Sequence, residues 1–213
     1  MTHLTANIAV LAVSMVLLAH NPLLATELTD ADSSGASDSV ATASEKQKSD
    51  SRTTGLCGVA VNVEFREGAP RDRFRFVNLS EAGWHIEAIS LRLESTAGRL
   101  VFDTEAGGKG VEVFQLFEVE SGTAELNSAQ LPDDGGNALD MSFTRFAAGD
   151  SFVFSIDVDD QLTASELGQI RVADSEMAGG ITALSLRDLS GALHAVELVF
   201  DSNSRSSVSV TDC

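Results

Sequence analysis

The sequence lacks the motifs that mark the common enzyme classes. It contains no Gly-x-Ser-x-Gly nucleophile elbow, no glycine-rich phosphate loop and no His-Glu-x-x-His zinc motif. Its cysteines stand in no Cys-x-x-Cys or Cys/His cluster, and His85 and His194 are far apart, which disfavours a zinc or redox site. A non-enzymatic role is therefore predicted. The enzymatic alternative is a hydrolase built on a pair of carboxylates, and no motif singles out such a pair.

Basic residues are also scarce. The chain has 14 Lys and Arg against 32 Asp and Glu, a formal net charge of −18 at pH 7. A field of this sign repels nucleic acid and anionic lipid, so neither is an expected partner. The field favours solubility and attracts divalent cations, although a solvated surface without a specific role has the same composition.

Long apolar runs are confined to the start of the chain. Residues 8–19 are uncharged, apolar or small, and too short for a comfortable membrane span, and small residues follow near position 25. This pattern predicts a signal peptide over residues 1–25. The protein is then secreted, periplasmic or held at the cell surface, with no membrane insertion after cleavage. Because no Lys or Arg precedes the run, an uncleaved anchor or a buried helix is an alternative.

Residues 26–55 have almost no large apolar side chains. They are rich in Ser, Ala, Asp and Thr, and they cannot bury enough apolar surface to offset the entropy lost on folding. We therefore expect a disordered, flexible linker here. Residues 56–213 are left as one domain, which is long enough to build a sizeable core.

Only two cysteines are present, and they bracket this domain. In an oxidising compartment, Cys57 and Cys213 are expected to form a disulfide that joins its two ends. Free or intermolecular thiols are the main alternative. Lipidation of Cys57 is disfavoured, because this residue lies far beyond the apolar run of the signal peptide.

Apolar residues alternate with polar ones along most of the domain, as in half-buried β-strands. Breakers rich in Gly, Pro and Asp separate the alternating stretches, and helical patterns are nearly absent. About ten short strands with polar turns predict an all-β fold, a β-sandwich or jelly roll. The expected strands cover residues 59–65, 73–77, 84–93, 100–103, 111–119, 124–131, 139–143, 152–158, 181–186, 196–200 and 206–210.

The alternation also predicts which side chains form the core. The apolar residues of the clearest strand, 152–158, and of residues 196–200 are expected to be buried; they include Phe152, Phe154, Ile156, Leu198 and Phe200.

The apolar phase flips within residues 84–93, which indicates a β-bulge near Ala88 and Ile89. The only tryptophan, Trp84, is in phase with Ile86. It is therefore expected in the core rather than on a carbohydrate-stacking surface.

The densest acidic group follows the clearest strand. Asp157 and Asp159 point to the same face of a strand, and Asp160 turns into the loop. Oxygen ligands at such a junction suit Ca²⁺, which takes six to eight of them. Other acids are candidates to complete this calcium site, namely Asp133 and Asp134, or Asp103 and Glu105. The spacing matches no EF-hand loop, and an acidic strand end exposed to solvent is the alternative.

Two segments carry a family resemblance. They are residues 107–117 (GGKGVEVFQLF) and 147–171 (AAGDSFVFSIDVDDQLTASELGQIR). Both resemble bacterial aggregation factor core proteins, a family named for similarity to the core protein of a sponge cell-aggregation proteoglycan. The resemblance extends over most of residues 57–213 and implies a role in adhesion, which in the sponge assembly depends on calcium and large glycans. It implies no active-site residues.

These observations together predict a secreted, non-enzymatic β-sandwich protein. It would act in cell adhesion, aggregation or matrix association, with calcium as a candidate aid and an extracellular protein or polysaccharide as partner. The alternative is a carbohydrate-binding module or a glycoside hydrolase that acts on extracellular polysaccharide. An exposed groove lined by Trp84 and two facing carboxylates favours that alternative, whereas a filled core favours adhesion. The oligomeric state is left open.

Overall fold

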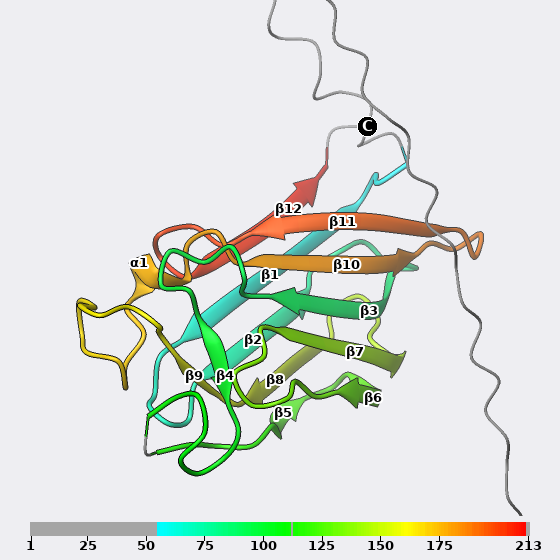
Figure 1. The fold of residues 1–213 in the computed structure, drawn as a ribbon. Coiled ribbons are helices and arrows are strands. Elements are labelled where there is room, and N and C mark those ends of the chain that lie inside the picture. Colours follow the sequence, from blue (N-terminus) through cyan, green and yellow to red (C-terminus); the bar gives the residue numbers. More distant parts are fainter. Residues whose placement is uncertain (1–54, 112, 212–213) are drawn as a thin grey trace, which may run out of the picture. The chain divides into compact units, whose positions relative to one another are not determined.

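Alternating apolar and polar residues produce two antiparallel sheets that face each other across one apolar core (Figure 1). The structure is a computed structural model and describes residues 55–111 and 113–211. The predicted all-β class and β-sandwich are confirmed. The signal peptide of residues 1–25 and nearly all of the predicted linker lie outside the described residues, so both stay predictions. No helix among the described residues is long and apolar enough to cross a bilayer.

The first sheet holds five strands, and each joins its neighbours in antiparallel register. In spatial order these strands are β12 (Arg205–Val210), β1 (Val59–Arg66), β2 (Arg73–Asn78), β8 (Ser151–Ser155) and β5 (Glu118–Gly122). Strand β5 is therefore an edge with a single strand neighbour.

The second sheet also holds five antiparallel strands. In spatial order they are β11 (Leu193–Val199), β10 (Ile181–Arg187), β3 (His85–Arg92), β7 (Ala138–Arg145) and β6 (Glu125–Gln130). Two short strands, β4 (Val101–Asp103) and β9 (Asp157–Asp159), form a separate small sheet, and α1 (Asp174–Met177) is a single helical turn.

Phenylalanine side chains fill the space between the sheets. All five predicted core residues are buried, from Phe152 and Phe154 to Phe200, and so is Trp84. The ring of Phe154 stacks against those of Phe74 and Phe76, at 5.2 and 6.1 Å between centroids. Offset aromatic contacts of this kind add to the free energy gained from area burial.

The predicted bulge is present, one residue earlier than expected. In the pairing of β3 with β10, Ala88 faces Ser185 and Ile86 faces Leu186. Glu87 is thus the extra residue without a partner, and it shifts the buried set of β3 from one phase to the other.

The strand predicted over residues 152–158 is in fact two strands. Strand β8 ends at Ser155 and belongs to the first sheet, whereas β9 begins at Asp157 and pairs with β4. Between them, the amide of Ile156 donates a hydrogen bond of 3.0 Å to the carbonyl of Asp72. The apolar alternation runs through this break without interruption and therefore gives no sign of it.

The two ends of the domain lie next to each other in the first sheet. Val59 in β1 faces Val210 in β12, and the Gly58 amide donates to the Val210 carbonyl at 2.8 Å. Cys213 lies outside the described residues, so its disulfide with Cys57 stays a prediction. The adjacent β1 and β12 support it, because they bring the sequence neighbours of both cysteines to the same end of the sheet.

Candidate functional site

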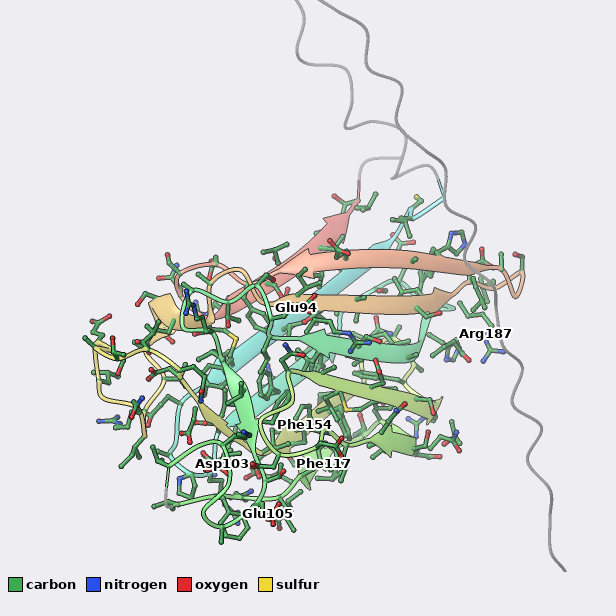
Figure 2. The ribbon with its side chains drawn as sticks, viewed as in Figure 1. Glu94, Asp103, Glu105, Phe117, Phe154 and Arg187 are labelled. Carbon is green, nitrogen blue, oxygen red and sulfur yellow. The ribbon has the colours of Figure 1, made fainter. Side chains whose placement is uncertain are left out.

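The small sheet brings three aspartates together. Asp103, the last residue of β4, faces Asp157 in β9, and Asp159 follows on the same face of β9. One carboxylate oxygen from each of the three lies within 4.8 Å of the others. Figure 2 labels Asp103 at this end of β4.

This arrangement follows from the alternation of acids with apolar residues in both strands. Phe102 and Val158 face each other on the opposite side of the small sheet and are fully buried in the core. Their burial stabilises the pairing of β4 with β9. The same pairing sets Asp103 directly opposite Asp157, and like charges in that position are destabilising.

The three carboxylates are buried, which the sequence did not indicate. Asp103 is 0% exposed, and Asp157 and Asp159 are each 1% exposed. The alternative of an acidic strand end exposed to solvent is therefore wrong. It failed because the outward face of β9 is covered by the loop that follows β4 rather than by water.

Each of the three carboxylates retains one oxygen without a hydrogen-bond donor. These atoms are Asp103 Oδ2, Asp157 Oδ2 and Asp159 Oδ1. Among the described residues, no lysine, arginine or histidine forms an ion pair with any of the three. Buried polar atoms are nearly always paired, and a buried carboxylate without a counter-charge is costly.

Burial and mutual repulsion make these groups hard to ionise. Burial, followed by the charge of Asp159, raises the pKa of Asp157 to about 8. The same two causes raise the pKa of Asp103 to about 6, and burial raises the pKa of Asp159. The cluster therefore requires either bound protons or a positive ion.

A glycine-rich loop covers the cluster. We call residues 104–111 the Gly110 loop. The Val111 amide donates to Asp159 Oδ2 at 2.7 Å, and the amides of Thr104 and Lys109 donate to the two oxygens of Asp134 at 3.0 and 2.6 Å. A Cβ atom on Gly110 would collide with Asp159 Oδ2 and Asp103 Oδ2. Only glycine at this position lets the backbone lie directly on the carboxylates.

The remaining predicted ligands lie around this group rather than in it. Asp160 is buried, its Oδ1 accepts the Leu162 amide at 2.9 Å, and its Oδ2 also has no donor in the described part of the chain. It does not belong to the group of three, whose ligand atoms lie within 4.8 Å of one another. Asp133 and Glu105 are exposed. Asp134 holds the Gly110 loop, as described above. Of the acids that the sequence offered to complete the site, the structure brings Asp103 into it.

Sequence reasoning missed Asp72. This residue is 1% exposed and lies before β2; its oxygens accept the Gly68 amide at 2.8 Å and the Val158 amide at 3.0 Å. It thereby holds β9 against the start of β2. Burial raises its pKa to about 7. No local pattern marks Asp72, because its partner Val158 is 86 residues away in the sequence.

The tryptophan offers no platform for a sugar. The Trp84 indole is buried, and its N–H donates to the Cys57 carbonyl at 2.9 Å. Its ring packs edge-on against His194, whose imidazole hydrogen-bonds Asp188 at 2.8 Å. These contacts fasten the beginning of the domain to β11 and leave no stacking face open.

The second notable feature is an exposed apolar edge. We call residues 113–122, which end in β5, the β5 edge. Its exposed apolar side chains are Val113, Phe114, Leu116 and Val119, and Leu116 is 58% exposed. Phe117 anchors the segment, because its ring lies 4.9 Å from that of Phe154 (Figure 2). The alternation predicts a strand over residues 111–119, but regular strand structure begins only at Glu118.

Polar contacts also fix the β5 edge to the first sheet. The Gln115 carbonyl accepts the Asp157 amide at 3.1 Å, so the segment continues directly beside β9. Arg71 pairs with Glu118 at 3.1 Å and Arg73 with Glu120 at 2.6 Å. The two acids of this edge are thus balanced by arginines at and just before the start of β2.

Fold and site together define an antiparallel β-sandwich with a buried aspartate cluster beneath a glycine-rich loop. No family model, no curated protein and no solved structure matches the chain. The resemblance to aggregation factor core proteins therefore stays a prediction.

Proposed function

We propose that this protein is a non-enzymatic extracellular association module that binds a second copy of itself through the β5 edge. The observation that carries the proposal is the edge itself, which combines the unpaired margin of β5 with four exposed apolar side chains, three of them in the segment that leads into the strand. Residues 113–122 contain no Lys, Arg or Pro, the residues with which sheet edges commonly oppose pairing.

A second copy suits this edge for geometric reasons. An edge strand presents backbone donors and acceptors that an antiparallel strand satisfies, which is a recurrent mode of recognition. When both strands are the same segment, a two-fold axis relates them and each copy covers the apolar side chains of the other. Aggregation or adhesion between like molecules then follows from one interface.

The charge distribution also favours the β5 edge as the place where a second copy binds. A net charge of −18 makes two copies repel each other over most of their surface. At the β5 edge, however, Arg71 and Arg73 offset Glu118 and Glu120. Two copies can approach there without bringing unbalanced charges together.

Sequence features support the extracellular setting. The apolar run of residues 8–19 and the pairing expected between Cys57 and Cys213 both suit export. The resemblance to aggregation factor core proteins points to adhesion as well.

Geometry argues against the polysaccharide-directed alternative. Carboxylates of retaining glycosidases lie roughly 5–5.5 Å apart, close to the spacing in the aspartate cluster. Those enzymes, however, expose both carboxylates to the substrate, whereas Asp103, Asp157 and Asp159 are at most 1% exposed. A sugar ring has no path to them, and Trp84 is not available for stacking.

Sedimentation velocity over a range of protein concentrations tests the proposal. We expect the wild-type protein to associate, and Leu116→Lys to remain a monomer with an unchanged circular dichroism spectrum. Leu193→Lys is the matched control, because Leu193 is 67% exposed at the edge strand β11 of the other sheet. A wild-type protein that stays monomeric up to millimolar concentration, or equal losses in both variants, would overturn the proposal.

A further inference from the structure

We infer that Asp103, Asp157 and Asp159 bind one divalent cation of the size of Ca²⁺ beneath the Gly110 loop. This ligand set differs from the run of neighbouring acids that the sequence suggests, because it draws on two strands and leaves out Asp160. The site does not depend on the proposed self-association and can be tested separately.

The spacing of the carboxylates fits the ion. Ca²⁺ binds oxygens at 2.3–2.6 Å, so two ligands on opposite sides of it lie roughly 4.6–5.2 Å apart. The three ligand atoms lie within 4.8 Å of one another. Mg²⁺ binds at 2.0–2.1 Å and usually keeps several bound waters, which suits carboxylates that are at most 1% exposed less well.

The unpartnered oxygens are the independent observation. A structural cluster of acids normally satisfies its buried oxygens with backbone amides, as Asp72 and Asp134 do here. Asp103, Asp157 and Asp159 each keep one fully buried oxygen that has no donor among the described residues. Each of these oxygens lacks the partner that a metal ion supplies.

The backbone of the Gly110 loop lies directly on the cluster. Gly110 lies so close to Asp103 Oδ2 and Asp159 Oδ2 that a methyl group does not fit. Three carboxylates offer as many as six oxygens, which meets the lower end of the coordination number of Ca²⁺. A doubly charged ion also offsets two of the three negative charges and so removes most of the repulsion between β4 and β9.

Cation binding would tie distant parts of the chain together. Asp103 ends β4, whereas Asp157 and Asp159 follow the core strand β8. Asp159 also accepts the amide of Val111, which leads into the β5 edge. The ion would therefore fasten the Gly110 loop and fix the start of that edge.

Isothermal titration calorimetry of the full chain, after treatment with a chelator, is the decisive experiment. We expect one Ca²⁺ per chain and at least tenfold weaker binding of Mg²⁺. Asp157→Asn, which keeps the shape of the side chain, should weaken Ca²⁺ binding at least tenfold. Asp133→Asn is the matched control, because Asp133 is an exposed acid outside the cluster, and it should bind as the wild type does.

Melting curves provide a second readout. Calcium should raise the melting temperature of the wild type and of Asp133→Asn, because an ion that binds only the folded chain stabilises it. Asp157→Asn should show a much smaller rise in melting temperature with calcium than the wild type does. If that variant fails to fold, Asp103→Asn takes its place, and the wild-type titration decides by itself.

The inference is overturned if the wild type takes up no calcium, or if Asp133→Asn loses as much affinity as Asp157→Asn. If no calcium binds, protons alone neutralise the buried carboxylates. Repeating the titration on Leu116→Lys separates the two proposals. If this variant is monomeric and still binds calcium, the cation site does not depend on self-association.

Discussion

Residues 152–159 pass through two regions whose inner faces are equally buried and whose outer faces differ. In β8, Phe152 and Phe154 enter the aromatic core, while the intervening Val153 lies on the partly open outer face. In β9, Val158 enters the core in the same way, but Asp157 and Asp159 on the other face are buried too. The two halves share one alternating pattern, and what differs is whether a loop covers the outer face.

Burial has opposite effects on free energy in the two regions. Burying Phe154 removes apolar surface from water and stabilises the fold, and it desolvates no charged group. Burying Asp157 removes a carboxylate from water and sets it opposite Asp103, which costs free energy unless a proton or a cation is bound. The aromatic region should therefore be insensitive to pH and calcium, and the acidic region sensitive to both.

The largest expected effect is in the aromatic region. Phe154→Ala should lower the free energy of unfolding by about 3–5 kcal/mol through lost burial and a residual cavity. Chemical denaturation measures this value. Phe114→Ala, at an exposed position of the β5 edge, should cost less than about 0.5 kcal/mol and serves as the control. Comparable losses in the two variants would show that the core does not depend on Phe154.

A steric change should perturb the acidic region next. Gly110→Ala places a methyl group against Asp103 and Asp159, and crowding of this kind costs roughly 1–3 kcal/mol. The loss should be visible as a lower denaturant midpoint, accompanied by weaker calcium binding. Unchanged stability together with unchanged calcium affinity would mean that the Gly110 loop does not lie on the carboxylates.

The pH dependence of stability should distinguish the two regions directly. Burial, followed by the charge of Asp159, raises the pKa of Asp157 from 3.8 to about 8 in the folded chain. The bound proton therefore stabilises the fold fully below about pH 4, and this contribution is lost as the pH rises through 8. In chelator, the free energy of unfolding should fall across this window by about 1.4 kcal/mol per pH unit for each extra proton held.

Variants and calcium should change this slope in a defined way. Asp157→Asn should flatten it, because the substituted amide does not titrate, while Asp133→Asn should keep it. Calcium should raise stability most above pH 8, where Asp157 has lost its proton. A slope that is the same in Asp157→Asn and in the wild type would contradict the assignment of the proton to Asp157.

The smallest effect on stability is expected at the β5 edge. Leu116→Lys changes an exposed side chain and should alter the free energy of unfolding by less than about 0.5 kcal/mol, although it should abolish self-association. Thermal melting and sedimentation on the same sample measure both quantities. A large loss of stability would place Leu116 in the fold rather than at an interface.

Much of the fold could be predicted from local pattern. The core positions of Phe152, Phe154 and Phe200 and the burial of Trp84 follow from a period of two, because successive side chains of a strand point to opposite faces. The bulge at Glu87 was detectable for the same reason, since one extra residue reverses the phase of everything after it.

The candidate site was only half predictable. The sequence placed Asp157 and Asp159 on one face of a strand, which is correct, and offered Asp103 as one of several acids to complete the set. It could not choose among them, because the pairing of β4 with β9 joins residues more than 50 positions apart. It also could not show that β8 ends before Asp157, since the apolar alternation continues across the break.

The sequence by itself determined the β class, the inward face of most strands and the excess of negative charge. These properties depend on neighbours in the chain and on composition. Only the tertiary structure decided that Asp103 faces Asp157, that the Gly110 loop excludes water from both, and that Leu116 and its apolar neighbours stay uncovered. The physical reason is that the burial of a side chain depends on which distant backbone lies over it. The local sequence around a polar residue in an alternating pattern does not indicate that contact.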